Sequence, residues 1–201
     1  QAASHALTAR ARDAAGFKNL TISGYLDPTV IWNKRQNRLG AQFLNNVSED
    51  GYNYDNSYFG SASIDFTKET DSGTRYRLTL TPSRGVGTVF TGASPVHEAS
   101  VSVPLSDLQT RFIAGQLPDW SGYEYLQPTL NKLITHNLLF DFTLPTGYIG
   151  AGIEYTSGKW VTKAMLAQMN QNANFSAAKG SVLAFRLDYA RGEYQGFGLA
   201  G

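Results

Sequence analysis

The chain has 201 residues, a formal net charge of +1 at pH 7 and no cysteine. This near-zero charge argues against nucleic acid as a partner, because such binding depends on neutralising many phosphates. No apolar run is long enough for a transmembrane helix, and the lack of cysteine is typical of periplasmic proteins but also of many cytosolic ones.

The first 17 residues differ in composition from the rest of the chain. They are rich in alanine and carry Arg10 and Arg12, and their apolar face is too weak for firm membrane attachment. We expect a helical or disordered periplasmic arm over residues 1–17 and a β domain over residues 18–201. The chain starts at Gln1, so either a signal peptide was cleaved, as we expect, or the sequence was trimmed.

From residue 18 onward, apolar and polar residues alternate in short segments separated by turn residues. Such alternation is typical of strands with one apolar face, and helical spacing is not sustained. We predict about nine or ten antiparallel strands, each near the length that crosses a bilayer when tilted. The segments are 20–26, 58–66, 76–80, 98–103, 110–117, 138–144, 149–155, 160–169, 183–189 and 193–200, with shorter pieces at 30–32 and 40–44.

Residues 138–155 form the clearest predicted hairpin, around a Pro-Thr-Gly turn at 145–147. Its apolar side chains share one face of both strands. They are Leu138, Phe140, Phe142, Leu144, Ile149, Ala151, Ile153 and Tyr155. In a soluble sandwich this face would pack against a second sheet, and in an outer-membrane barrel it would face lipid.

The links between the predicted strands alternate in length along the first part of the chain. Outer-membrane barrels combine short periplasmic turns with longer extracellular loops, so this alternation favours a barrel. The long links are 27–56, 84–96 and 118–136, and the short ones are 68–73, 105–109 and 145–147. The alternation then fails, because 156–159 is short and 170–180 is long.

Three further features favour lipid over a soluble core, although alternation alone leaves both readings open. Glycines recur on the polar face at Gly115, Gly150 and Gly152, and charges sit in the middle of strands. Aromatic residues fall near strand ends, as in the girdles of membrane barrels. They are Tyr58, Phe66, Tyr76, Tyr148, Tyr155, Trp160 and Tyr189.

Charged residues on the polar side of the strands are the candidates for lining a pore. They are Asp65, Arg75, Arg77, Arg111, Asp141, Glu154, Lys163, Arg186 and Asp188. Their slight basic excess predicts weak selectivity that leans towards anions. Each could instead form an ion pair between neighbouring strands, such as Arg75 or Arg77 with Asp65.

The link at 118–136 is the best candidate for a constriction loop, because it combines aromatic and charged side chains. These are Asp119, Trp120, Tyr123, Glu124, Tyr125 and Lys132. No pattern indicates an enzyme, a cofactor or a metal site, since the histidines at 5, 97 and 136 lack ligand spacing and no GxSxG motif occurs.

The stretch from Ala114 to Phe142 resembles the OmpL-like β-barrel porins of Gram-negative outer membranes. The residues that carry the resemblance are Gly115, Gln116, Leu117, Gly122, Tyr123, Glu124, Pro128, Asn131, Asn137, Leu138, Leu139 and Phe140. The usual Phe-Thr-His-Thr-Gly turn of those porins is replaced here by Pro-Thr-Gly at 145–147, which suits a sister family equally well. The resemblance implies a diffusion channel and more strands than the chain shows.

The sequence therefore predicts an all-β protein, an antiparallel up-and-down transmembrane β-barrel that is truncated at Gly201. The expected function is passive diffusion of ions or small solutes across the outer membrane, without cofactor or nucleic acid. We expect outer-membrane lipid to surround the barrel, and the barrel could form a homo-oligomer. The alternatives are a soluble all-β module that binds carbohydrate and a barrel that serves as a scaffold without conducting.

Overall fold

The computed structural model describes residues 16–33, 38–42, 62–81, 95–133, 147–169, 180–190 and 196–201. Almost all of the predicted N-terminal arm therefore lies outside the described residues, as do Tyr58 and the predicted strand 138–144. Within the described residues there is no α-helix, and no helix has the length and apolarity needed to cross a membrane.

Eleven strands and one short 3-10 helix, η1, make up the described structure. They are β1 (Leu20–Leu26), β2 (Thr29–Asn33), β3 (Arg38–Gln42), β4 (Ala62–Glu69), β5 (Arg75–Leu80), β6 (Val96–Pro104), β7 (Thr110–Pro118), η1 (Pro128–Leu130), β8 (Gly147–Ser157), β9 (Trp160–Met169), β10 (Gly180–Ala190) and β11 (Gly196–Ala200). The prediction of short strands of period two is confirmed, including the two strand pieces in the first long link.

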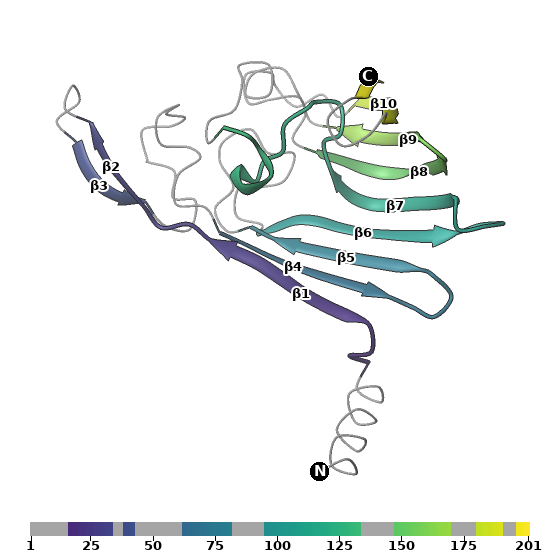
Figure 1. The fold of residues 1–201 in the computed structure, drawn as a ribbon, viewed down its shortest axis with the longest axis horizontal. Coiled ribbons are helices and arrows are strands. Elements are labelled where there is room, and N and C mark those ends of the chain that lie inside the picture. Colours follow the sequence, from purple (N-terminus) through teal and green to yellow (C-terminus); the bar gives the residue numbers. More distant parts are fainter. Residues whose placement is uncertain are drawn as a thin grey trace, which may run out of the picture.

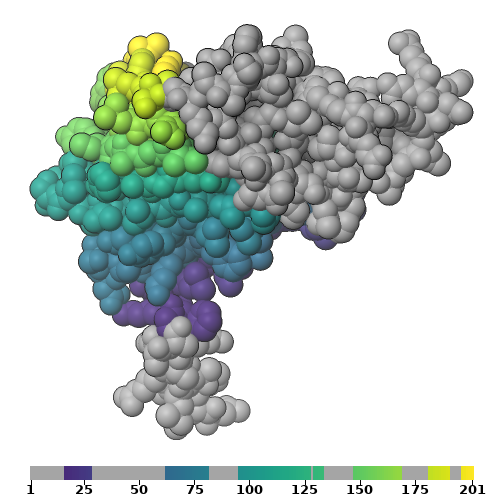
Figure 2. All heavy atoms as spheres, turned by 180° about the vertical axis from the view of Figure 1, so that it is seen from behind, coloured from purple at the N-terminus to yellow at the C-terminus, as the bar shows by residue number. Residues whose placement is uncertain are grey.

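Nine of these strands form one antiparallel sheet in chain order, β1-β4-β5-β6-β7-β8-β9-β10-β11. The sheet runs from β1 at one edge to β10 and β11 at the other (Figure 1), and Figure 2 shows it as successive bands from purple to yellow. β2 and β3 pair only with each other. In the described part of the chain, β1 and β11 are open edges, so the up-and-down order is confirmed but closure into a barrel is not shown.

The register keeps the same face of each strand continuous across the sheet, because residues directly opposite each other point to the same side. One row of opposed residues starts at Arg75 on β5 and ends at Ala184 on β10. Between them lie Ser102, Ile113, Gly152 and Met165. We call the side of the sheet to which this row points the polar face; residues two positions away along each strand point to the same side. The polar face carries Asp65, Arg75, Arg77, Thr79, Glu98, Ser100, Arg111, Glu154, Lys163, Arg186 and Asp188.

Large apolar side chains on the opposite, apolar face are exposed from one edge of the sheet to the other. They are Ile22, Leu26, Ile64, Tyr76, Leu78, Phe112, Ile149, Ile153, Tyr155, Trp160, Leu166, Leu183, Phe185, Phe197 and Leu199. Leu166 and Leu183 are 70% and 61% exposed, although both lie within long strands. The predicted face of Ile149, Ile153 and Tyr155 is confirmed.

The predicted hairpin between 138–144 and 149–155 is wrong in its pairing. One edge of β8 is bonded to β7 from Gly147 to Tyr155, and the other edge is bonded to β9. A strand has only two hydrogen-bonding edges, so β7 and β9 are the neighbours of β8, and the predicted partner strand 138–144 lies outside the described residues. The sequence pattern shows which residues alternate, but it does not show which strands become neighbours.

This correction also restores the alternation of link lengths along the whole sheet. The long links are 27–61, 81–95, 119–146 and 170–179, and the short links are 70–74, 105–109, 158–159 and 191–195. All short links lie at one end of the sheet, at the right of Figure 1 where they are drawn in colour, because consecutive strands are antiparallel. Because β7 and β8 are neighbours, the link between them is 119–146, and the alternation of lengths then continues as far as β11.

Aromatic side chains gather on the apolar face at the end with the short links. The rings of Trp160 and Tyr189 lie 4.7 Å apart, and Phe197 lies 5.9 Å from Trp160 and 5.3 Å from Tyr189 between ring centroids. Tyr76 and Tyr155 occupy the same end of β5 and β8. Predicted strand-end aromatics are thus found on this face at this end, like one girdle of a membrane barrel.

Tyr148 does not belong to that aromatic set, contrary to the prediction. It lies on the polar face opposite Leu117 and is only 2% exposed. Its side chain packs in a small buried cluster with Met165, Ala167 and Ala184. Tyr148 is an even-numbered residue like Gly150 and Gly152, so its parity alone assigns it to the polar face.

Candidate functional site

The charged residues predicted to line a pore share one face of the sheet. Those that the structure describes are Asp65, Arg75, Arg77, Arg111, Glu154, Lys163, Arg186 and Asp188. Asp141 lies outside the described residues. Their common face follows from the register, whereas their role in a pore stays a prediction.

Asp65 lies at the centre of a polar network that spans β4, β5 and β6. Its Oδ1 accepts hydrogen bonds from Arg77 Nε at 3.0 Å and from Thr79 Oγ1 at 2.5 Å. Arg77 Nε also lies 3.5 Å from Oε2 of the buried Glu98, whose Oε1 accepts from Ser100 Oγ at 2.6 Å. The network satisfies charges that would be costly to bury alone. Arg77 thus forms the expected bridge to Asp65.

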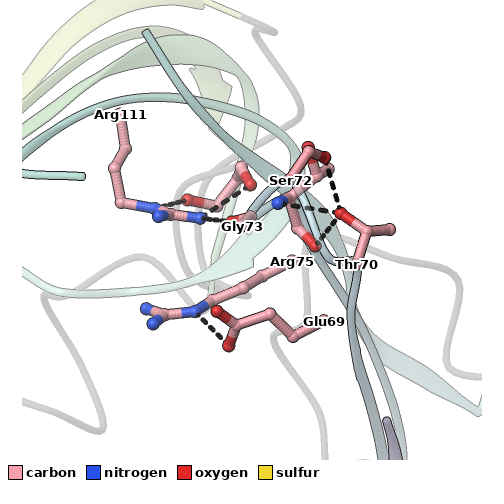
Figure 3. A network of polar contacts seen from close by, with 8 residues as sticks. Glu69, Thr70, Ser72, Gly73, Arg75 and Arg111 are labelled. Carbon is pink, nitrogen blue, oxygen red and sulfur yellow. Dashed lines mark hydrogen bonds and ion pairs between the residues drawn. The ribbon is translucent and has the colours of Figure 1, made fainter. Parts of the chain in front are cut away.

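Arg75 and Arg111 lie beside the β4–β5 turn, as Figure 3 shows. Arg75 pairs with Glu69 directly opposite, with 2.9 Å between Nε and Oε2, rather than with Asp65. Arg111 donates from Nη2 to the carbonyl oxygens of Gly73 at 2.7 Å and Ser102 at 2.9 Å. Its side chain is 4% exposed, so Arg111 holds the turn against β6 and β7 rather than presenting a free charge.

The charges on β8, β9 and β10 are also paired. Lys163 Nζ lies 2.8 Å from Glu154 Oε2, directly opposite in the register, and 5.9 Å from the ring centroid of Trp120. That second distance is within the range of a cation–π contact. Within β10, Arg186 Nε donates to Asp188 Oδ2 at 2.5 Å. Opposite charges therefore compensate each other along most of this half of the polar face.

Residues 119–133, here called the inward loop, follow β7 and contact the polar face. Tyr148 Oη donates a hydrogen bond to Asp119 Oδ1 at 2.8 Å, and the rings of Tyr148 and Trp120 lie 5.3 Å apart. Ser121 donates to the same carboxylate oxygen from its backbone nitrogen and its hydroxyl, at 2.9 and 2.6 Å. The start of the loop is thereby folded back onto β8.

Arg186 holds the inward loop from β10. Its Nη1 donates to the carbonyl oxygens of Trp120 at 2.6 Å and Gly122 at 2.9 Å. The side chain of Trp120 also packs against the buried cluster around Met165. Strands β8 and β10 thus position this loop together on the polar face, whereas its role as a constriction stays a prediction.

The second part of the inward loop closes on itself around η1. Asn131 donates from Nδ2 to the carbonyl oxygen of Tyr125 at 2.6 Å and accepts from its backbone nitrogen at 2.8 Å. Tyr123 is 80% exposed, Lys132 is exposed and Glu124 is half-buried. The predicted loop residues therefore divide into anchors near the strand and exposed side chains further along.

A hollow of about 820 Å³ lies between the inward loop and strands β10 and β11. The charged or hydroxyl-bearing residues among those that line it are Ser121, Tyr123, Lys132, Arg186, Asp188 and Tyr189. The sequence named the loop and the strand residues separately, but it did not indicate that they meet. Among the described residues, no group of three or more acidic or histidine side chains could hold a metal ion.

A family model described as "Protein of unknown function (DUF3138)" matches residues 3–184, which is most of the chain. The chain belongs to the DUF3138 family. The matched region of this DUF3138 chain contains β1 to β9 and the whole inward loop. No curated protein and no solved structure matches the chain significantly. The resemblance to OmpL-like porins therefore stays a prediction.

Proposed function

We propose that this DUF3138 chain contributes its sheet to an outer-membrane β-barrel that lets ions or small solutes diffuse passively. The observation that carries the proposal is the distribution of polarity between the two faces. Large apolar side chains are exposed from β1 to β11, while the charged side chains gather on the other face. A membrane barrel has this polarity, with lipid outside and a polar interior.

A soluble protein would have to cover the apolar face. Contiguous exposed apolar patches of more than a few hundred square ångströms are rare on soluble monomers. Here the patch extends over the sheet, and no described residue packs a second layer against Leu166 or Leu183, which stay mostly exposed. In a bilayer these side chains need no cover, because the acyl chains are themselves apolar.

The link lengths and the aromatic side chains support the same proposal. Short links gather at one end of the sheet and long links at the other, as in barrels with short periplasmic turns. The cluster of Trp160, Tyr189 and Phe197 lies at the short-link end, where an interfacial girdle would be expected. The proposal therefore places the short links at the periplasmic side.

The proposal requires the edges of β1 and β11 to be paired in the membrane, because open backbone groups are very costly in lipid. The test therefore uses the full-length protein, folded into detergent micelles and lipid vesicles. We expect its migration on a gel to change on boiling, and single channels to appear in planar bilayers. A protein that stays monomeric without detergent and shows no shift would contradict the membrane proposal. A protein whose gel migration changes on boiling, but that forms no channels in planar bilayers, would be a scaffold.

Ile153→Arg tests the orientation of the apolar face at one residue. Ile153 is 50% exposed on this face of β8. At mid-bilayer, an outward arginine should lower the unfolding free energy in vesicles by roughly 2–4 kcal/mol. Urea titration of vesicle-folded protein measures this, with Ile153→Leu as the control that keeps the side chain apolar. On a wetted surface the arginine would cost almost nothing, so equal stabilities of the two variants would refute the assignment of this face to lipid.

A further inference from the structure

The hollow beside the inward loop contains hydrogen-bond donors that have no acceptor among the described residues. Arg186 has five N–H groups, of which Nε–H binds Asp188 and those on Nη1 bind the carbonyl oxygens of Trp120 and Gly122. No described residue accepts from Nη2. These contacts also hold the guanidinium in place, so its remaining donors are oriented in advance.

Lys132 adds a second cation to the same hollow. Its side chain is exposed and forms no ion pair within the described part of the chain, although it lines the hollow with Arg186. Asp188 compensates one of the two positive charges. The charges of the described lining residues therefore sum to one positive charge, which one negative charge on a solute would balance.

The size of the hollow argues against a simple inorganic anion. Its volume of about 820 Å³ is in the range of sites for small organic molecules, roughly 300–1,000 Å³. A dianion would also bring an additional negative charge close to Asp188, which repels it. The fitting solute is a larger molecule with a single negative charge.

The other groups in the hollow can bind hydroxyl groups. Ser121 Oγ donates to Asp119 and keeps its lone pairs for an incoming donor. The hydroxyl of Tyr123 has no partner among the described residues, and this side chain is 80% exposed. We propose that the hollow binds a small hydroxylated monocarboxylate, such as a sugar acid, with its carboxylate between Arg186 Nη2 and Lys132 Nζ.

This inference deepens the proposed function, since it assigns a solute class to the polar face of the channel. Its test measures binding without conduction. Gluconate is titrated by calorimetry into full-length protein folded in detergent micelles at low salt. We expect gluconate to bind and glucose, which lacks the carboxylate, not to bind. Because charge-assisted hydrogen bonds are strong, Lys132→Gln should weaken binding by about tenfold or more, and Lys132→Arg should restore it.

Lys18→Gln is the matched control, because Lys18 is an exposed lysine beside β1, at the edge of the sheet opposite β10 and β11. It should leave gluconate affinity unchanged. The inference fails if folded protein does not bind gluconate, if Lys132→Gln binds as tightly as the original, or if inorganic phosphate competes equally well. Channel recordings on the same preparations separate the two proposals. Conduction without gluconate binding refutes only the inference, and binding without conduction refutes only the channel.

Discussion

At Gly152, the polar face has no room for a side chain. A Cβ atom at this position would overlap the carbonyl oxygen of Ala164 and the Cβ of Met165, and one at Gly150 would overlap the carbonyl oxygen of Leu166. Met165, which lies against Gly152, is only 1% exposed. The glycines predicted from the sequence to allow either close approach or lumen space therefore serve close approach.

Gly152→Ala should destabilise the sheet for this reason. The added methyl group forces β8 and β9 apart, and such overpacking typically costs about 1–3 kcal/mol. Urea unfolding of the detergent-folded protein measures the loss. Ala151→Val is the control, because residue 151 is exposed on the apolar face one position earlier and should tolerate the larger side chain. Equal unfolding midpoints for the two variants would show that the strands are less closely packed than described.

Asp107 gives the β6–β7 turn a dependence on pH. Its Oδ1 accepts from the backbone nitrogens of Thr110 at 2.6 Å and Gln109 at 2.9 Å. The hydrogen bond from Thr110 is the largest cause that lowers the pKa of Asp107 below its ordinary value of 3.8. A depressed pKa means that the carboxylate stabilises the turn above pH 3.8, and that this stabilisation is lost as the pH falls through the lower pKa of the folded state.

Asp107→Asn should remove this dependence while its amide oxygen still accepts a hydrogen bond. In the original protein, amide exchange at Thr110 should become less protected as the pH falls below 3.8, after correction for the intrinsic exchange rate. In the variant, protection should stay constant over the same range. NMR exchange measurements compare the two, and a parallel decrease in both proteins would assign the effect to another group.

Among the elements, the inward loop depends most on contacts with distant strands. Its start is held by Tyr148 on β8 and by Arg186 on β10, which are far away in the sequence. Two buried atoms, Asp119 Oδ2 and Trp120 Nε1, have no hydrogen-bond partner in the described part of the chain. The loop is therefore held by a few strong contacts rather than by a complete hydrogen-bond network.

Tyr148→Phe should loosen the inward loop without changing the sheet. Losing one hydrogen bond to a carboxylate typically costs about 1.5–3 kcal/mol, so locally opened states should become more populated by about tenfold or more. Limited proteolysis within residues 119–133 would report this as faster cleavage. Tyr155→Phe, with its ring exposed on the apolar face, should cleave like the original protein. Unchanged cleavage of Tyr148→Phe would mean that Arg186 alone holds the loop.

For the whole molecule, the pairing of charges across the polar face governs what a channel would conduct. Glu154 and Lys163 are a directly opposed pair beside Trp120, close to the anchored start of the inward loop. Because they compensate each other, removing either one changes the local charge by one unit in a known direction.

Lys163→Gln should therefore shift selectivity towards cations, and Glu154→Gln should shift it towards anions. Each variant leaves its former partner as an uncompensated charge in the proposed lumen. The reversal potential in a salt gradient across a planar bilayer measures both shifts. The two variants are controls for each other, since shifts of the same sign, or none, would place this pair outside the conducting path.

Several elements were predictable because their signal is local. Strands such as β5 and β10 follow from alternation within a few residues, and the same alternation assigns Ile153 and Glu154 to opposite faces. Tyr148 was grouped with the girdle aromatics because aromatic residues are frequent near strand ends in membrane barrels. Its even number, which assigns it to the buried polar face, was the better guide. The bridge between Asp65 and Arg77 was predictable, since both lie on consecutive strands joined by a short turn.

The sequence by itself determined the period of the strands and the polarity of each face, because successive side chains on a strand point to opposite sides whatever its neighbours are. Only the tertiary structure decided that β8 lies between β7 and β9, and that the inward loop returns to the polar face beside Arg186. Strand neighbours and loop anchors are chosen by competition among distant segments for hydrogen-bonding edges and buried contacts. A local pattern does not record the outcome of that competition.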